Sequence, residues 1–125
     1  MHFLIADIDE DSNRELQLAL SEFGPCDIKR DITSVFRTFD ENPGASRYEA
    51  FFLSLGTLES NAVETLKHMR KHYRGIYDTL RFIVLDESEE AISIMRICAS
   101  HKLQFIEKPV DRKKLIRMMQ DLRII

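Results

Sequence analysis

Short runs of consecutive apolar residues recur along the chain and are separated by stretches in which polar residues dominate. Continuous runs of this length, rather than alternating ones, are typical of strands buried on both faces of a parallel sheet. The most apolar run is Phe51-Phe52-Leu53-Ser54-Leu55, which we interpret as the central strand. In the run from 26 to 30 only Ile28 is strongly apolar, so we expect that strand at the sheet edge. The predicted strands lie at 2–6, 26–30, 51–55, 79–85 and 103–107.

Between these runs, apolar residues recur with the i, i+3, i+4 and i+7 spacing of a helix that packs on one face. The predicted inward stripes are Leu16, Ala19, Leu20 and Phe23; Ile32, Val35, Phe36 and Phe39; Ala62, Leu66, Met69 and Tyr73; Ala91, Met95, Cys98 and Ala99; and Leu115, Met119 and Leu122. The predicted N-caps are Asp11 or Ser12, Asp31 and Asp111. Strands that alternate with helices through short connections predict an α/β fold, a doubly wound parallel sheet covered on both faces by right-handed crossovers.

Length and composition restrict the class of protein. A chain of 125 residues is long enough for one domain with a proper core, and we take residues 1–125 as that domain. It is 44% hydrophobic with a net charge of -3, which is ordinary for a globular protein and a poor fit to a nucleic-acid binder. No apolar run approaches the roughly 20 residues that span a bilayer, and no secretory signal is recognisable. Cys26 and Cys98 have no metal-type spacing, so we expect a reduced, cytoplasmic setting.

Polar residues stand where four of the predicted strands end. They are Asp7, Ser54, Asp86 and Lys108. In open parallel α/β sheets, ligands bind in the crevice at the carboxyl ends of the strands. If these strands are neighbours, the four side chains meet in one crevice, which is the candidate functional site.

Over its whole length the chain resembles the receiver domains of bacterial response regulators, the modules of two-component phosphorelay signalling. The resemblance is carried by the apolar third strand with its polar terminus and by Leu4-Ile5-Ala6-Asp7, Phe82-Ile83-Val84-Leu85 and Phe105-Ile106-Glu107-Lys108-Pro109, of which the last is the most specific. It implies the flavodoxin-like receiver fold with strand order 2-1-3-4-5. It also implies that Lys108 belongs to the phosphorylation site and that Phe105 takes the position of an aromatic conformational switch.

Three positions depart from the family pattern. Ser54 stands where a working receiver has the Asp that accepts phosphate, and a serine hydroxyl cannot form an acyl phosphate. Ile8 replaces the second of two adjacent acids, a direct Mg²⁺ ligand, so we expect Mg²⁺ binding to be lost or weak and no other cofactor. Asp86 replaces the Ser or Thr that holds the phosphoryl group. The resemblance therefore indicates a pseudo-receiver that is not an enzyme and acts by phosphorylation-independent protein–protein interaction, with Lys108 paired to Asp86 or Asp7.

The segment Asp7-Ile8-Asp9 also resembles the Asp-x-Asp motif of haloacid-dehalogenase-like phosphatases, in which the first Asp is the nucleophile and the second the general acid. This alternative would use Asp7 and Asp9, with supporting roles for Ser54, Lys108 and Asp86. Its motif order disagrees, because the Lys of that family normally precedes the last acidic motif. Asp9 could instead join Asp7 in a weak metal site, although negative charge at a helix N-terminus is favourable without any metal.

Two apolar residues of the predicted helix at 91–99 lie off its inward stripe. Ile97 projects roughly opposite that stripe and Ile94 lies at its edge, a pattern that can mark a binding patch. In receivers this helix, the fifth strand and the last helix form a common dimer or partner surface, which Arg112 would border. We expect as partners other signalling proteins, an output domain in a longer chain or a second copy, and neither a membrane nor nucleic acid. The apolar end Ile124-Ile125 is compatible with a chain cut from a longer protein.

His68 and His72 are spaced i, i+4, with Glu64 one turn earlier, and this spacing is adequate for a metal ion. They fall on the face opposite Leu66 and Met69. A solvated helix face is therefore the preferred interpretation of this pair.

Overall fold

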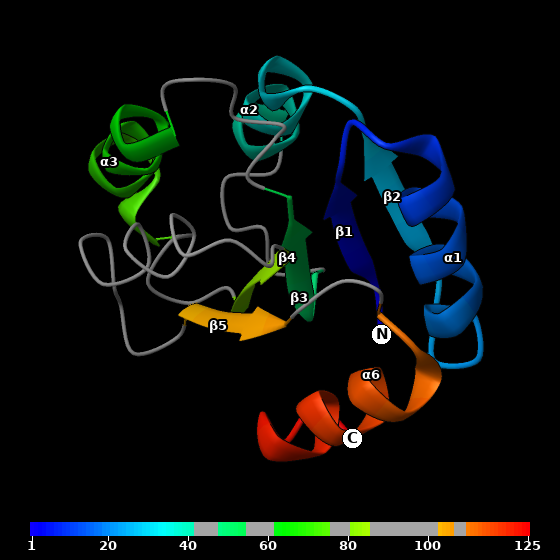
Figure 1. The fold of residues 1–125 in the computed structure, drawn as a ribbon. Helices are drawn as coiled ribbons and strands as arrows, with labels where there is room; N and C mark the ends of the chain where they lie inside the picture. Colours follow the sequence, from blue (N-terminus) through cyan, green and yellow to red (C-terminus); the bar gives the residue numbers. More distant parts are fainter. Residues whose placement is uncertain (42–47, 55–61, 76–80, 86–102, 107–109) are drawn as a thin grey trace.

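The computed structural model describes residues 1–41, 48–54, 62–75, 81–85, 103–106 and 110–125 (Figure 1). These residues form a five-stranded sheet in the order β2-β1-β3-β4-β5, in which every neighbouring pair is parallel. The strands are β1 (Phe3–Ala6), β2 (Cys26–Lys29), β3 (Ala50–Leu53), β4 (Arg81–Leu85) and β5 (Leu103–Ile106). The predicted strand order is confirmed, and the weakly apolar β2 lies at the edge of the sheet as expected. β1 begins at Phe3 and β2 ends at Lys29, each one residue inside the predicted bounds, because strand ends merge into the loops.

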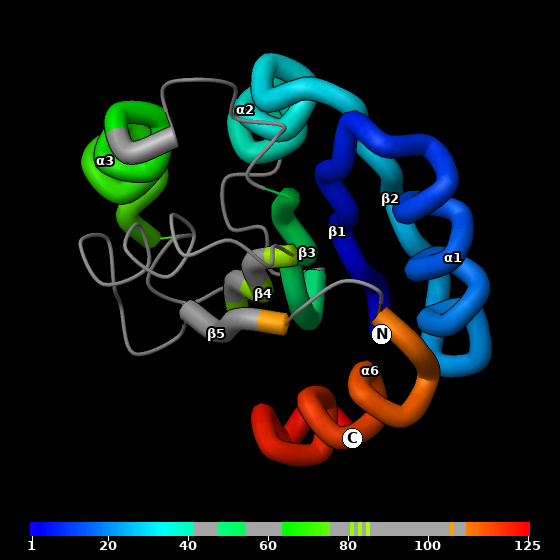
Figure 2. The backbone as a smooth tube through the Cα atoms, in the orientation of Figure 1, coloured from blue at the N-terminus to red at the C-terminus, as the bar shows by residue number. Residues whose placement is uncertain are grey.

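The helices in the described part of the chain cover both faces of the sheet. They are α1 (Glu10–Leu20), α2 (Ile32–Glu41), α3 (Ala62–His72) and α6 (Arg112–Asp121). Figures 1 and 2 show α1 and α6 on one face and α2 and α3 on the other. The helix predicted at 91–99 lies outside the described residues. Within those residues, no helix has the length and apolar character needed to cross a membrane.

Each of three helices begins at an aspartate whose side chain accepts hydrogen bonds from backbone N–H groups of the first turn. The predicted caps Asp31 and Asp111 are confirmed, with Oδ1 2.7 Å from the nitrogen of Ser34 and 2.8 Å from that of Lys114. For α1 the prediction of Asp11 or Ser12 was wrong, because Asp9 is the N-cap and its side chain accepts from the backbone N–H groups of both residues. The apolar stripe of α1 begins only at Leu16, in the second turn of the helix. The stripe therefore did not indicate at which residue the helix begins.

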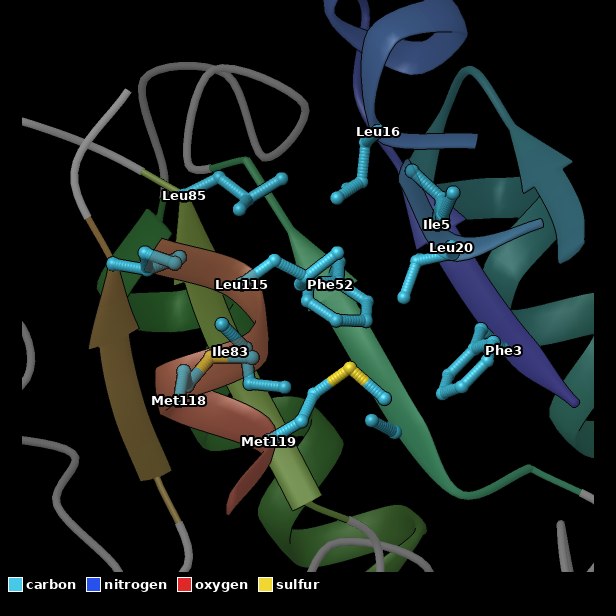
Figure 3. Close-up of a cluster of buried hydrophobic side chains, with 12 residues drawn as sticks. Phe3, Ile5, Leu16, Leu20, Phe52, Ile83, Leu85, Leu115, Met118 and Met119 are labelled. Carbon is cyan, nitrogen blue, oxygen red and sulfur yellow. The ribbon is translucent and has the colours of Figure 1, made fainter. Parts of the chain in front are cut away.

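The core on the α1 and α6 face is built from alternate residues of the strands (Figure 3). Since successive strand residues point to opposite faces, Phe3 and Ile5 of β1 and Phe52 of β3 face this core, while Phe51 packs on the α2 side against Phe39. The helices contribute Leu16, Leu20, Leu115, Met118 and Met119. All residues of β1 and β3 are fully buried, which confirms that both strands are covered on both faces.

The C-terminal end of α6 is closed by backbone hydrogen bonds. The N–H of Ile124 donates to Met119 O (2.8 Å) and the N–H of Arg123 donates to Gln120 O (3.0 Å), the pattern of a Schellman motif. Arg123 has a φ of 58°, the left-handed conformation that this motif requires and that glycine adopts most easily. The motif turns the chain so that Ile124 packs against the core.

Candidate functional site

Asp7 and Ser54 lie next to each other at the carboxyl edge of the sheet. Asp7 follows β1 and Ser54 follows β3, and these strands pair in parallel with Ala6 opposite Leu53. The backbone N–H of Ser54 donates to Ala6 O (2.9 Å), which extends the hydrogen-bond ladder between β1 and β3 as far as the two polar residues. Asp7 is 1% exposed and Ser54 is 6% exposed, so this edge of the sheet carries two buried polar groups. Two of the four predicted crevice residues are thus brought together by strand pairing.

The loop after β1 is held by Asp7 and Asn13. The Asp7 carboxylate accepts a hydrogen bond from the backbone N–H of Asp9 (3.0 Å). Asn13, which is 4% exposed, donates from Nδ2 to Asp7 O (2.7 Å), while its Oδ1 is buried with no hydrogen-bond partner among the described residues. Sequence reasoning missed Asn13. The signal available in the sequence was its spacing. Asn13 stands three residues before Leu16 and seven before Leu20, so it lies on the inward face of α1.

The side chains of Ile8 and Asp9 both turn away from the protein interior. Ile8 is 60% exposed. Asp9 is exposed, and both its oxygens are engaged by the first turn of α1: Oδ1 accepts from the N–H groups of Asp11 (3.0 Å) and Ser12 (3.4 Å), and Oδ2 from the Ser12 hydroxyl (3.4 Å). The phosphatase alternative needs this carboxylate beside Asp7, whereas its hydrogen bonds are those of a helix cap.

The structure describes two of the remaining predicted site residues, Phe105 and Arg112. Phe105 lies in β5 at the register position opposite Val84. Asp86, Lys108, Ile94 and Ile97 lie outside the described residues. Arg112, at the start of α6, donates from Nε (3.2 Å) and Nη2 (3.3 Å) to the Glu22 carboxylate beyond the end of α1. This forked ion pair joins two helices that are adjacent on one face of the sheet.

A second polar cluster lies at the opposite, amino edge of the sheet. The Tyr48 hydroxyl donates to Asp27 Oδ2 (2.5 Å), and His2 Nε2 lies 3.2 Å from the same oxygen. Burial and the neighbouring Asp27 charge raise the pKa of the half-buried Cys26 thiol to about 11. Such a thiol is protonated and unreactive at neutral pH. This cluster ties together the ends of β1, β2 and β3.

Comparison with known proteins finds similarity in structure alone. No family model matches the sequence, and no curated protein matches it. The chemotaxis protein CheY4 of Vibrio cholerae is 13% identical with a TM-score of 0.74, over 96% of each chain. A two-component response regulator from Clostridium difficile is 17% identical with a TM-score of 0.74, over 98% of this chain and 96% of that one. NtrX from Brucella abortus is 20% identical with a TM-score of 0.72, over 96% of this chain but 26% of NtrX.

These similarities, together with the strand order 2-1-3-4-5, assign the fold. The chain has the α/β fold of CheY-like response-regulator receiver domains, with Asp7 and Ser54 at the carboxyl edge of the sheet. At such low identity, structural similarity shows only the fold. The chemistry has to be inferred from the residues at the carboxyl edge of the sheet.

Proposed function

We propose that the chain is an atypical receiver domain of two-component signalling that does not accept phosphate and acts through protein–protein contact. The observation that carries this proposal is Ser54, a buried neutral hydroxyl at the end of β3 beside Asp7. In a receiver that position holds the carboxylate on which the acyl phosphate forms. With serine there, the domain has no acceptor for the phosphoryl group of a histidine kinase, and we propose no enzymatic activity for it.

Loss of the magnesium site is part of the same proposal. Mg²⁺ requires oxygen ligands in a near-octahedral array. At the described part of the crevice, Ile8 offers an exposed hydrocarbon side chain where a ligand is needed, and the Asp9 carboxylate is engaged by α1. Asp7 remains as a carboxylate, with one oxygen accepting from the Asp9 N–H. These residues do not fit a receiver's magnesium site, so we propose that the domain works without Mg²⁺ or another cofactor in the crevice.

A single conformation follows if the crevice charges pair permanently. Asp7 is fully buried, and a buried carboxylate is stable only with hydrogen bonds or a cation to compensate for its lost hydration. We propose that Lys108 supplies a cation to Asp7 or Asp86 and that Phe105 is a switch position held in one state. Lys108→Ala should then lower the melting temperature well below that of a lysine substitution on an exposed helix face, such as Lys113→Ala. An equal, small effect of both substitutions would contradict the ion pair.

The proposed partner surface is the face that Ile94, Ile97 and Arg112 border. Partners would be other signalling proteins, an output domain in a longer chain or a second copy of this domain. NtrX is an example of a longer response regulator of which this chain spans about a quarter. Ile97→Asp should weaken self-association or partner capture while the melting temperature stays unchanged. The setting we propose is the cytoplasm, with no direct contact to membrane or nucleic acid.

The decisive experiment combines intact mass after acetyl phosphate with an amide NMR titration by Mg²⁺ and beryllofluoride. We expect no mass gain and no saturable shifts at residues 7, 54, 86 and 108. The matched control is the double variant Ile8→Asp and Ser54→Asp, which restores both missing carboxylates and should recover Mg²⁺-dependent shifts if it remains folded. An added phosphate on the unmodified chain, or saturable shifts around its crevice, would overturn the proposal.

A further inference from the structure

Two histidines lie side by side on the exposed surface of α3. His68 and His72 are one helical turn apart, and their ring centroids are 4.2 Å from each other with an interplanar angle of 35°. Both side chains are exposed. Residues spaced i, i+4 share one face of a helix, so the two imidazoles approach the same region of solvent from adjacent turns.

The His68 ring is packed against an aromatic side chain of the neighbouring helix. Phe36 of α2 lies 5.2 Å from the His68 ring and stacks on Tyr73 at 5.4 Å with an interplanar angle of 15°. The Tyr73 hydroxyl donates to Asp40 Oδ1 (2.8 Å), which ties this group of rings to α2. Contacts on one side of the His68 ring restrict its rotation. Less conformational freedom is then lost when the ring binds a ligand.

We propose that His68 and His72 form a two-ligand site for a divalent transition-metal ion such as Zn²⁺, Ni²⁺ or Cu²⁺. Imidazole nitrogen is a preferred ligand for these ions, and alkaline-earth ions prefer oxygen. With metal–nitrogen bonds of about 2.1 Å and a coordination angle between roughly 90° and 110°, the two ring centroids would lie about 4.5 to 5.2 Å apart. The observed 4.2 Å therefore needs a side-chain adjustment of about 1 Å or less, which the exposed His72 side chain can make while His68 stays against Phe36.

The site is open, because the protein supplies two ligands and water completes the coordination shell. Across the described residues, no three or more His, Cys, Asp or Glu side chains gather around one point that could hold a metal. Arg70 and Lys71 add positive charge in the same last turn of α3 and weaken the attraction for a cation. Affinity thus depends on simultaneous binding by both rings, and loss of either ring removes the chelate.

The test is a Zn²⁺ titration by calorimetry together with Ni²⁺-induced broadening of amide signals, both on the full chain. We expect one saturable site, with broadening centred on residues 65–75. His72→Gln and His68→Gln should each abolish saturable binding at this site, with the helical circular dichroism unchanged because both positions are exposed.

Two control variants separate chelation from the mere presence of histidine. Lys67→His combined with His68→Gln keeps two histidines in α3 but spaces them five residues apart on different faces, and it should not restore binding. His2→Gln should bind as the unmodified chain does. Absence of saturable binding by the unmodified chain, unchanged binding by His72→Gln, or restored binding by the spacing control would overturn the proposal. None of these outcomes depends on whether Ser54 accepts phosphate.

Discussion

Replacing Asp9 by Ala tests whether this carboxylate is a helix cap or part of a metal or catalytic site. In the structure its oxygens accept hydrogen bonds from the N–H groups of Asp11 and Ser12 and from the Ser12 hydroxyl. The first N–H groups of a helix have no partner within the helix, so loss of the cap leaves them to water. The expected result of Asp9→Ala is a lower stability of the folded state, with no change in what the crevice binds.

The magnitude follows from the kind of cap. Loss of an aspartate N-cap costs about 1 kcal/mol, within a range of about 0.5 to 2. For a domain of this size that corresponds to a fall of about 3 to 5 °C in melting temperature. Asp9→Asn keeps a good capping side chain and loses only the favourable interaction of the charge with the helix dipole, about 0.3 to 1 kcal/mol. The alanine variant should therefore be the less stable of the two.

The assay is thermal and urea unfolding followed by circular dichroism, with and without Mg²⁺. Asp111→Ala is the matched control, because Asp111 caps α6 through the Lys114 N–H and lies outside the crevice loop. Its loss of stability should be similar to that of Asp9→Ala. A rise in the melting temperature of the unmodified chain with Mg²⁺ that Asp9→Asn abolishes would refute the cap assignment, as would an unchanged stability of Asp9→Ala.

Three further substitutions test the core, a cap and the chain end. Phe52→Ala, at a fully buried position of β3, should cost about 3 to 5 kcal/mol in urea unfolding, a large part of the stability of a small domain. The backbone hydrogen bond from Ser34 holds the pKa of Asp31 below its usual 3.8, so its charge stabilises the fold at neutral pH and this contribution is lost as pH falls through the depressed value. Asp31→Asn, which keeps the cap, should show a smaller loss of melting temperature on acidification; an identical pH profile would contradict this. Arg123→Gly should raise stability by about 0.5 to 1 kcal/mol by relieving the positive φ, and a lower melting temperature would show that the arginine side chain matters more than the backbone conformation.

The edge position of β2 could be predicted because burial is recorded in residue type, whereas the full strand order was implied by the resemblance to receiver domains. Strands covered on both faces need continuous apolar runs, which β1 and β3 have, and an edge strand tolerates the polar composition of β2. The caps Asp31 and Asp111 were equally predictable, since capping depends on residues within one turn. The cap of α1 was misplaced because Asp9, Asp11 and Ser12 follow one another closely and all three have side chains that can cap a helix.

Contacts between distant segments could not be predicted from the local pattern. The sequence pattern did not predict that the Arg112 guanidinium binds Glu22, which is far away in the sequence. The place of Arg112 at the border of a partner surface stays a prediction. Asn13 was missed because its partner is the backbone carbonyl of Asp7, and a carbonyl leaves no trace in residue type. The cluster of His2, Asp27 and Tyr48 forms only because three strands align their amino ends.

The sequence by itself determined the α/β alternation, the edge position of β2 and a hydroxyl side chain, that of Ser54, directly after the most apolar run, because residue type and short-range spacing carry these properties. Only the tertiary structure decided that Ser54 lies beside Asp7 and that Ile8 faces solvent. It also decided that Phe36 of α2 packs against His68 of α3. The physical reason is that parallel strands pair across long stretches of chain, so their pairing sets which side chains meet at one edge and which helices share one face.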